Sequence, residues 1–144
     1  MGISSPITII EIMGRDAGWL SAAASMFKRD MYDPPHYIGV PEITFYEDVF
    51  LLRMEESYRE NGYAIAVVAE NIKGPEGAIG GQTEPRFVDD YGHPYYDGPA
   101  RYLAEKVSRR LGVRCRHEKP GTIQRSFMDS VSTCLLYTSP SPRD

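Results

Sequence analysis

The 144-residue chain lacks several features by which common classes of protein are recognised. It contains no apolar run near the roughly 18 residues that a transmembrane helix needs, so no membrane partner is expected. Acidic residues outnumber basic ones by 20 to 16, and the resulting charge of −4 argues against a protein that binds the nucleic-acid backbone. The first six residues lack the basic start and apolar core of a signal peptide, so we expect a cytoplasmic location.

Few residues are of the types that build metal centres or nucleophilic sites. Cys115 and Cys134 make neither a disulfide framework nor a metal site, and no Gly-x-Ser-x-Gly nucleophile motif is present. The glycines of residues 73–86 lack the Gly-Lys-Ser/Thr ending of a phosphate-binding loop, which favours a flexible surface loop. Asp89-Asp90 fits a cation-binding pair, although a polar turn explains it as well. Three histidines are too scattered for a zinc site and are interpreted as loop or surface residues: His36, His93 and His117.

The last eleven residues, 134–144, have no helical or strand period. They correspond codon by codon to a transposase adapter that is attached to fragments in short-read sequencing libraries. A natural tail rich in serine and proline is the alternative. We expect residues 134–144 to be adapter-derived and residues 1–133 to be a natural but incomplete domain.

The remaining sequence alternates between strand-like and helix-like segments. Strands are expected at 7–12, 37–40, 63–69 and 113–118, and helices at 19–28, 47–60 and 100–111. Such alternation predicts an α/β fold, a layered domain with a mainly parallel sheet in which 63–69 is a central strand. Within the first helix, the apolar positions expected to face the sheet include Leu20, Ala23, Ala24 and Phe27.

Charged residues gather where the expected strands end. Arg15 follows the first strand, Glu70 follows the central one, and 119–125 follow the last. Because ligands of open α/β sheets bind outside the carboxyl ends of the strands, arginines here could clamp a phosphate while a carboxylate accepts hydrogen bonds from sugar hydroxyls. The pattern favours a phosphorylated, hydroxyl-rich ligand, although each arginine taken alone also fits a solvated surface charge.

Four sequence blocks in one order carry a resemblance to a known family. They are Ile10-Glu11-Ile12-Met13-Gly14-Arg15-Asp16-Ala17-Gly18-Trp19, Pro41-Glu42, Val68-Ala69-Glu70 and Gly121-Thr122-Ile123-Gln124-Arg125. Together they resemble the phosphofructokinase family over about residues 6 to 130. The resemblance implies a phosphofructokinase-like α/β domain and a transferase that moves a phosphoryl group from ATP or diphosphate to fructose 6-phosphate in glycolysis. Trp19 and the Gln124-Arg125-Ser126 context lean toward the diphosphate-using relatives.

The resemblance also implies a role for each matching residue. Met13 and Gly14 would contact fructose 6-phosphate, and Arg15 would face the phosphoryl group in transit, as the residue closest to catalysis. Glu70 would hold sugar hydroxyls. The phosphate of the sugar would be bound by Thr122 and Arg125, with Arg116 reaching across from a neighbouring subunit, which implies a homo-oligomer.

The chain departs from the family pattern at two positions and lacks one region. Thr122 stands where the family has His or Tyr, and Pro6 stands where many members have a second cross-subunit arginine. In the family, the donor-binding glycines, the acid that binds Mg²⁺ and the proton-accepting Asp precede the Met-Gly-Arg block. We therefore expect a piece of a 6-phosphofructokinase that holds the sugar phosphate, supplies no metal ligand and is inactive by itself. The alternatives are a non-catalytic sugar-phosphate-binding or regulatory module and a structural fragment without activity.

Overall fold

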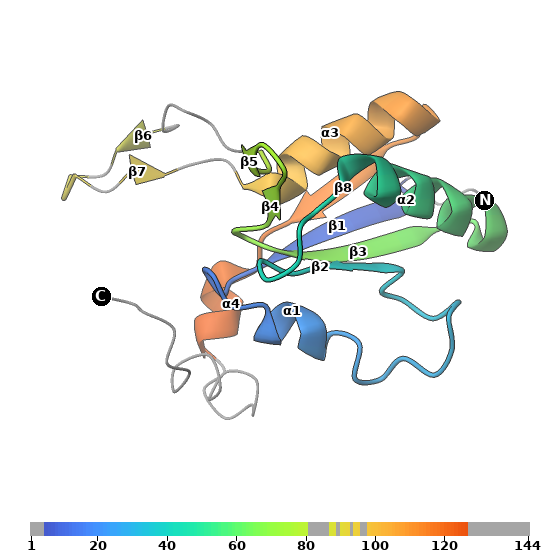
Figure 1. Cartoon of the computed structure of the whole chain (residues 1–144), viewed down its shortest axis with the longest axis horizontal. Helices are drawn as coiled ribbons and strands as arrows, with labels where there is room; N and C mark the ends of the chain where they lie inside the picture. The colour runs from blue at the N-terminus through green and yellow to red at the C-terminus, as the bar shows by residue number, and fades with distance from the viewer. Residues whose placement is uncertain (1–4, 81–86, 89, 93, 96–97, 127–144) are drawn as a thin grey trace.

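The computed structural model describes residues 5–80, 87–88, 90–92, 94–95 and 98–126, and Figure 1 shows their arrangement. Strands and helices alternate along most of this length, as the sequence predicts. In chain order the elements are β1 (Ile7–Ile12), α1 (Trp19–Ala23), β2 (Tyr37–Gly39), α2 (Glu47–Asn61), β3 (Ala64–Ala69), β4 (Lys73–Gly74), β5 (Gly77–Ala78), β6 (Phe87–Val88), β7 (Pro94–Tyr95), α3 (Pro99–Leu111), β8 (Cys115–Glu118) and α4 (Gly121–Ser126).

Four strands form one parallel sheet in the order β2-β3-β1-β8. Ile7 of β1 lies opposite Ala64 of β3 on one side and Cys115 of β8 on the other, so β1 and β3 are the two central strands. The predicted parallel α/β sheet and the central place of β3 are confirmed. Because all four strands run the same way, their carboxyl ends meet at one edge of the sheet.

Helices α2 and α3 cover one face of this sheet, and α1 lies on the other (Figure 1). Burial alternates along β1, and two of its buried residues, Ile7 and Ile9, belong to the hydrophobic core. The helices contribute residues three or four positions apart, as expected for one buried face of a helix. These fully buried residues are Phe50 and Met54 of α2 and Leu103 and Val107 of α3.

Both long helices end on glycine. Gly62 after α2 has a φ of 75°, and Gly112 after α3 has a φ of 66°. These left-handed values suit glycine, which has no Cβ to clash with the following backbone. The predicted ends of both helices are therefore confirmed.

The first helix is shorter than predicted. It ends at Ala23, and the chain continues to Lys28 in tight turns whose amides bond to the carbonyl three residues back. Of the positions expected to face the sheet, Ala24 is exposed and Phe27 is 90% exposed, while the buried residue of α1 is Ser21. Tighter turns with three residues per turn rotate later side chains away from the face that a longer α-helix would have presented.

Three further features were not predicted. A short helix, α4, follows β8, and the loop predicted at 73–86 contains the small β4–β5 hairpin, while its residues 81–86 lie outside the described part. His36 lies in the loop before β2, but it is buried and not on the surface, with its ring packed edge-on against Tyr63 at 5.2 Å between ring centroids. Asp89 and His93 lie outside the described residues.

Candidate functional site

The candidate site lies at the carboxyl edge of the parallel sheet. The Met13–Arg15 turn (residues 13–15) follows β1, Glu70 follows β3, and α4 follows β8 after a two-residue connection, Lys119 and Pro120. The backbone confirms that these segments are neighbours, because the amide of Glu70 donates to the carbonyl of Ile12 over 3.0 Å. Parallel strands therefore bring together segments that are more than fifty residues apart in sequence.

The Met13–Arg15 turn is held by the side chain of Glu70. One carboxylate oxygen, Oε1, accepts hydrogen bonds from the amide of Gly14 at 3.1 Å and from the amide of Arg15 at 2.6 Å. Arg15 has a φ of 48°, a left-handed conformation that is unfavourable for a residue with a Cβ. The two hydrogen bonds to a charged acceptor compensate for this backbone conformation.

Two more side chains hold the same segment. Oε1 of Gln124 in α4 accepts from the amide of Met13 at 3.3 Å, and Oε1 of Glu42 accepts from the amide of Gly18 at 2.8 Å. A Cβ on Gly18 would lie 2.5 Å from Cβ of Val40 and 2.7 Å from Oε2 of Glu42, so this close approach requires glycine. Gln124 and Glu42 belong to the four sequence blocks, but the sequence alone assigns them no role. Their positions after β8 and β2 are a signal that could have suggested a role, because side-chain acceptors there can meet free backbone amides.

The guanidinium of Arg15 is available for a ligand. Its side chain is exposed and makes no ion pair or hydrogen bond with the described part of the chain. The next residue, Asp16, forms an ion pair with Lys73 across 3.3 Å. The carboxylate adjacent to Arg15 in the sequence is therefore paired with another cation. Oε2 of Glu70 likewise accepts no hydrogen bond from the described residues. Within the described residues, the guanidinium of Arg15 and Oε2 of Glu70 thus remain without a partner, one on the Met13–Arg15 turn and one beside it.

The remaining predicted site residues are only partly placed. Thr122 and Arg125 belong to α4, beside the Met13–Arg15 turn, but their side chains lie outside the described part. Arg116 is an exposed residue of the edge strand β8 and lies opposite Thr8 of β1. Thr8 precedes Ile12 by four residues, or about 13 Å at the usual rise of a strand. The structure therefore does not bring Arg116 together with Arg15 within this chain.

A buried carboxylate lies just below the turn. Glu11 of β1 is 2% exposed, and its Oε2 accepts a hydrogen bond from the amide of Ala100 at 3.3 Å. Its Oε1 forms an ion pair with Nζ of Lys119 at 2.8 Å. Nothing in the local sequence singles out Glu11, because it lies in a run of β-branched residues without a recognisable partner.

The described residues contain few other groups with unusual chemistry. Burial raises the pKa of the Cys115 thiol to about 12, so the thiolate needed for nucleophilic reactions is scarce at neutral pH. No three His, Cys, Asp or Glu side chains lie close enough together in the described part to hold a metal ion. No helix among the same residues is long and apolar enough to cross a membrane.

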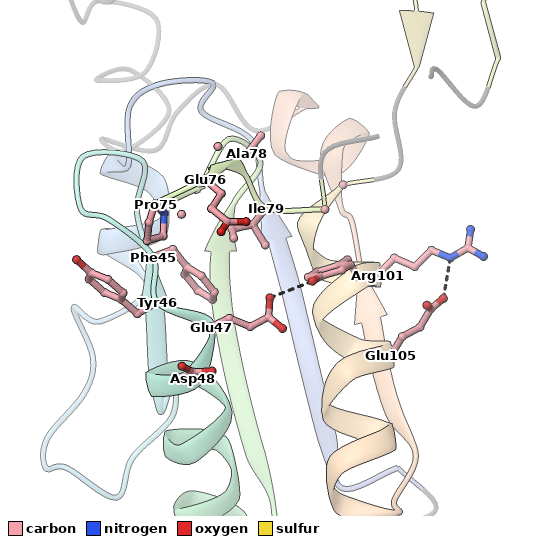
Figure 2. A pocket seen from close by; sticks show the side chains of 15 residues that line it. Phe45, Tyr46, Glu47, Asp48, Pro75, Glu76, Ala78, Ile79, Arg101 and Glu105 are labelled. Carbon is pink, nitrogen blue, oxygen red and sulfur yellow. Dashed lines mark hydrogen bonds and ion pairs between the residues drawn. The ribbon is translucent and has the colours of Figure 1, made fainter. Parts of the chain in front are cut away.

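An open pocket of about 770 Å³ lies beside the candidate site, between the first turns of α2 and α3 and the β4–β5 hairpin. Figure 2 shows its aromatic and acidic lining, with Glu47 bonded to the hydroxyl of Tyr102 and Arg101 paired with Glu105. Arg101, the cation in the lining, is already paired with Glu105, and Glu47 is paired with Lys106, so the lining offers little positive charge for a phosphorylated ligand. Its acidic lining residues are Glu47, Asp48, Glu76 and Glu105.

Sequence comparison finds relatives along nearly the whole chain. Residues 3–139 match the family described as Phosphofructokinase. A pyrophosphate–fructose 6-phosphate 1-phosphotransferase from Halomonas elongata is 33% identical over 123 residues, covering 85% of this chain and 29% of that protein. An ATP-dependent 6-phosphofructokinase from Corynebacterium efficiens is 34% identical over 133 residues, covering 92% of this chain and 36% of that protein.

Solved structures give the same result. The crystal structure of a pyrophosphate-dependent phosphofructokinase from Marinobacter aquaeolei matches with a TM-score of 0.66 and 28% identity. The match covers 93% of this chain and 30% of that one. The chain thus spans about a third of the length of the relatives it matches.

Proposed function

Because the chain belongs to the phosphofructokinase family, we propose that it forms the fructose 6-phosphate side of a 6-phosphofructokinase. The parent enzyme would transfer a phosphoryl group from ATP or diphosphate to the 1-hydroxyl of the sugar. The observation that carries this proposal is the Met13–Arg15 turn, held at the carboxyl edge of the sheet by Glu70 and Gln124. Its relatives include both diphosphate-dependent and ATP-dependent enzymes, so the proposal leaves the donor open.

The turn gives Arg15 the role closest to the reaction. Phosphoryl transfer spreads negative charge over the oxygens of the group in transit, and a fixed cation stabilises that charge. Support for this role comes from the exposed guanidinium, which has no partner in the described part of the chain, and from the backbone held by Glu70. A fixed backbone limits the reorganisation that would otherwise reduce the benefit of the charge.

The sugar would contact the same turn. Met13 and Gly14 would pack against fructose 6-phosphate, and Oε2 of Glu70 would accept hydrogen bonds from its hydroxyls while Oε1 keeps the turn in place. Thr122 and Arg125 would bind the phosphate of the sugar from α4. A guanidinium at this position can bind two phosphate oxygens at once, whereas Thr122 can donate a single hydrogen bond.

Arg116 would act in a neighbouring subunit, so the parent enzyme would be a homo-oligomer. Its exposed place on the edge strand β8, about 13 Å along the sheet from the turn, fits a residue that serves another copy. By resemblance to the family, Mg²⁺ would be held in the parent enzyme by an acid that precedes the Met-Gly-Arg block. No step of the proposal is therefore assigned to the metal.

Binding of fructose 6-phosphate to the chain tests the proposal. We expect NMR titration to show binding of fructose 6-phosphate but not of fructose, with shifts at the amides of the Met13–Arg15 turn. Arg125→Ala should weaken binding at least about tenfold, since it removes a charge-assisted contact. Arg109→Ala removes an exposed arginine from the far end of α3 and should leave binding unchanged. Equal binding of fructose and its phosphate, or equal effects of the two variants, would exclude the proposal.

The chain by itself should not turn over. A coupled assay with fructose 6-phosphate and either donor is expected to show no fructose 1,6-bisphosphate above the blank without enzyme. The reason is that, by resemblance, the proton-accepting Asp and the donor-binding glycines precede the Met-Gly-Arg block. Turnover by the 144-residue chain would contradict this division of the site.

Residues 134–144 are proposed to be translated adapter, and residues 1–133 to be the natural part. The proposal rests on the agreement of eleven consecutive residues with the adapter codons. Amplifying and sequencing the gene from source DNA tests it. A natural gene that encodes the same eleven residues would exclude the adapter.

A further inference from the structure

A buried acid in β1 serves no function in the site described so far. Glu11 is 2% exposed and follows the core residues Ile7 and Ile9 on the same face of the strand. Removing a carboxylate from water is costly unless hydrogen bonds and an opposite charge compensate for the lost hydration. A hydrophobic residue at this position would avoid that cost. The role of Glu11 therefore lies in the groups that its carboxylate contacts.

The first partner is the start of α3. Gly98, which precedes the helix, has no side chain to cap it, and Oε2 of Glu11 accepts the hydrogen bond from the amide of Ala100 instead. A Cβ on Gly98 would collide with the carboxylate of Glu11, so the glycine leaves room for the acid. Negative charge at the start of a helix is also favoured by the helix dipole. This contact explains an acceptor at position 11 but not the need for a cation.

The second partner is Lys119, whose Nζ lies 2.8 Å from Oε1 of Glu11. The lysine side chain is 54% exposed, yet its charged end reaches a carboxylate that is 3% exposed. Lys119 ends the connection from β8 together with Pro120, and α4 begins at the next residue, Gly121. The ion pair therefore fixes the point at which α4 leaves the sheet.

A second contact fixes the other part of α4. Oε1 of Gln124 accepts from the amide of Met13, two residues after Glu11 in the chain. Two contacts thus join α4 and the residues just before it to β1 and its turn. One is the ion pair of Lys119 with Glu11, and the other is the hydrogen bond from the amide of Met13 to Gln124. A helix of only six residues has little stability of its own, so such contacts decide its placement.

We propose that Glu11 and Lys119 are positioning residues, and that their ion pair holds α4 against the Met13–Arg15 turn. The pair sets the distance between the turn and the helix that carries Thr122 and Arg125. This inference rests on the proposed function where it concerns the sugar phosphate. The placement of α4 can be measured without a ligand.

Three variants separate the two contacts of Glu11. Glu11→Gln keeps an oxygen for the amide of Ala100 and removes the charge that binds Lys119. Lys119→Met keeps the length of the side chain without its charge, and Lys119→Arg restores a cation. Lys106→Met is the matched control, because Lys106 pairs with Glu47 at 3.0 Å but has no contact with α4 among the described residues.

Amide hydrogen exchange of the full 144-residue chain is the first measurement. In Glu11→Gln and Lys119→Met, we expect exchange at Met13 and in α4 to become at least about tenfold faster, with β3 and α2 unchanged. Lys119→Arg should restore slow exchange, and Lys106→Met should not change it. A role limited to global stability would accelerate exchange in β3 and α2 as well. Uniform acceleration, or no acceleration at α4 in Lys119→Met, would overturn the proposal.

Affinity for fructose 6-phosphate is the second measurement. We expect the dissociation constant to rise about tenfold in Lys119→Met and to return close to that of the unaltered chain in Lys119→Arg. If the unaltered chain binds no fructose 6-phosphate while α4 still loosens in Lys119→Met, the positioning role stands and the proposed function is wrong. If binding occurs and neither α4 nor the affinity responds to Lys119→Met, the positioning role is wrong and the function stands.

Discussion

Replacing Glu70 should release the Met13–Arg15 turn without unfolding the sheet. Oε1 of Glu70 accepts two backbone hydrogen bonds, at 2.6 Å from Arg15 and 3.1 Å from Gly14. A hydrogen bond to a charged group contributes about 1.5–3 kcal/mol to stability. Because Arg15 is exposed, water can replace part of this stabilisation after the carboxylate is removed. We therefore expect Glu70→Ala to lower the local stability of the turn by about 1–3 kcal/mol.

That range translates into a measurable rate. At about 1.4 kcal/mol for each factor of ten, the amides of Gly14 and Arg15 should exchange about 5 to 150 times faster in Glu70→Ala. Glu70→Gln keeps an oxygen in the same place but loses its charge, so its effect should be less than half as large in free energy. Glu60→Ala, which alters an exposed acid near the end of α2, is the matched control and should not affect the turn.

Amide exchange by NMR and urea denaturation by circular dichroism distinguish local from global effects. Faster exchange at Gly14 and Arg15 with an unchanged urea midpoint and slope would support a local release of the turn. Glu70→Ala and Glu60→Ala with the same exchange rates would refute the role of Glu70 in holding the turn. Equal effects of Glu70→Ala and Glu70→Gln would show that the charge itself holds the turn, whereas exchange in Glu70→Gln as slow as in the unaltered chain would show that charge is unimportant there.

Three further outcomes are expected. Met54→Ala should lower the free energy of unfolding by about 2–5 kcal/mol in urea denaturation, because Met54 is fully buried, and Met54→Leu should cost much less. Burial, aided by nearby Lys28, lowers the pKa of His36 from 6.5, so the folded state favours the neutral ring, whose Nδ1 accepts from the amide of Ile65. The stability that the neutral ring of His36 contributes is present above pH 6.5 and is lost as the pH falls through the lower pKa of the folded state. Urea midpoints should therefore drop on acidification, and His36→Asn should reduce the drop. In a Cys134→Ser background, the Cys115 thiol, with its pKa raised to about 12, should react with iodoacetamide at pH 8 far more slowly than in urea, and equal rates would contradict its burial.

The sequence predicted the sheet well because local pattern and burial agree there. The β-branched run at Ile7–Ile12 and the apolar run that became β3 leave little alternative to buried strands. Gly62 and Gly112 mark the ends of α2 and α3 because left-handed φ values are costly for other residues. The sequence also placed Glu70 at the site, because the carboxyl ends of parallel strands lie at the same edge of a sheet.

The contacts that build the site could not be predicted in the same way. Glu11 and Lys119 lie over one hundred residues apart, and nothing in the local sequence of either shows that they meet. The length of α1 was overestimated because alanines favour a helix, whereas after Ala23 the backbone adopts tighter turns. His36 lies in the loop before β2, but its burial could not be predicted because it depends on Tyr63, which is distant in sequence.

The separation of Met13 from its partner has a consequence for how the protein is made. The amide of Met13 bonds to Gln124, 111 residues later, whereas Glu70 follows Gly14 by 56 residues. During synthesis, the contacts of Gly14 and Arg15 with Glu70 can form while α3 and α4 do not yet exist. The contact of Met13 must wait until residue 124 has been synthesised. Until β8 has formed, the edge of β1 that β8 covers also stays unpaired. A growing chain is therefore most open to aggregation or chaperone binding before β8 is added beside β1.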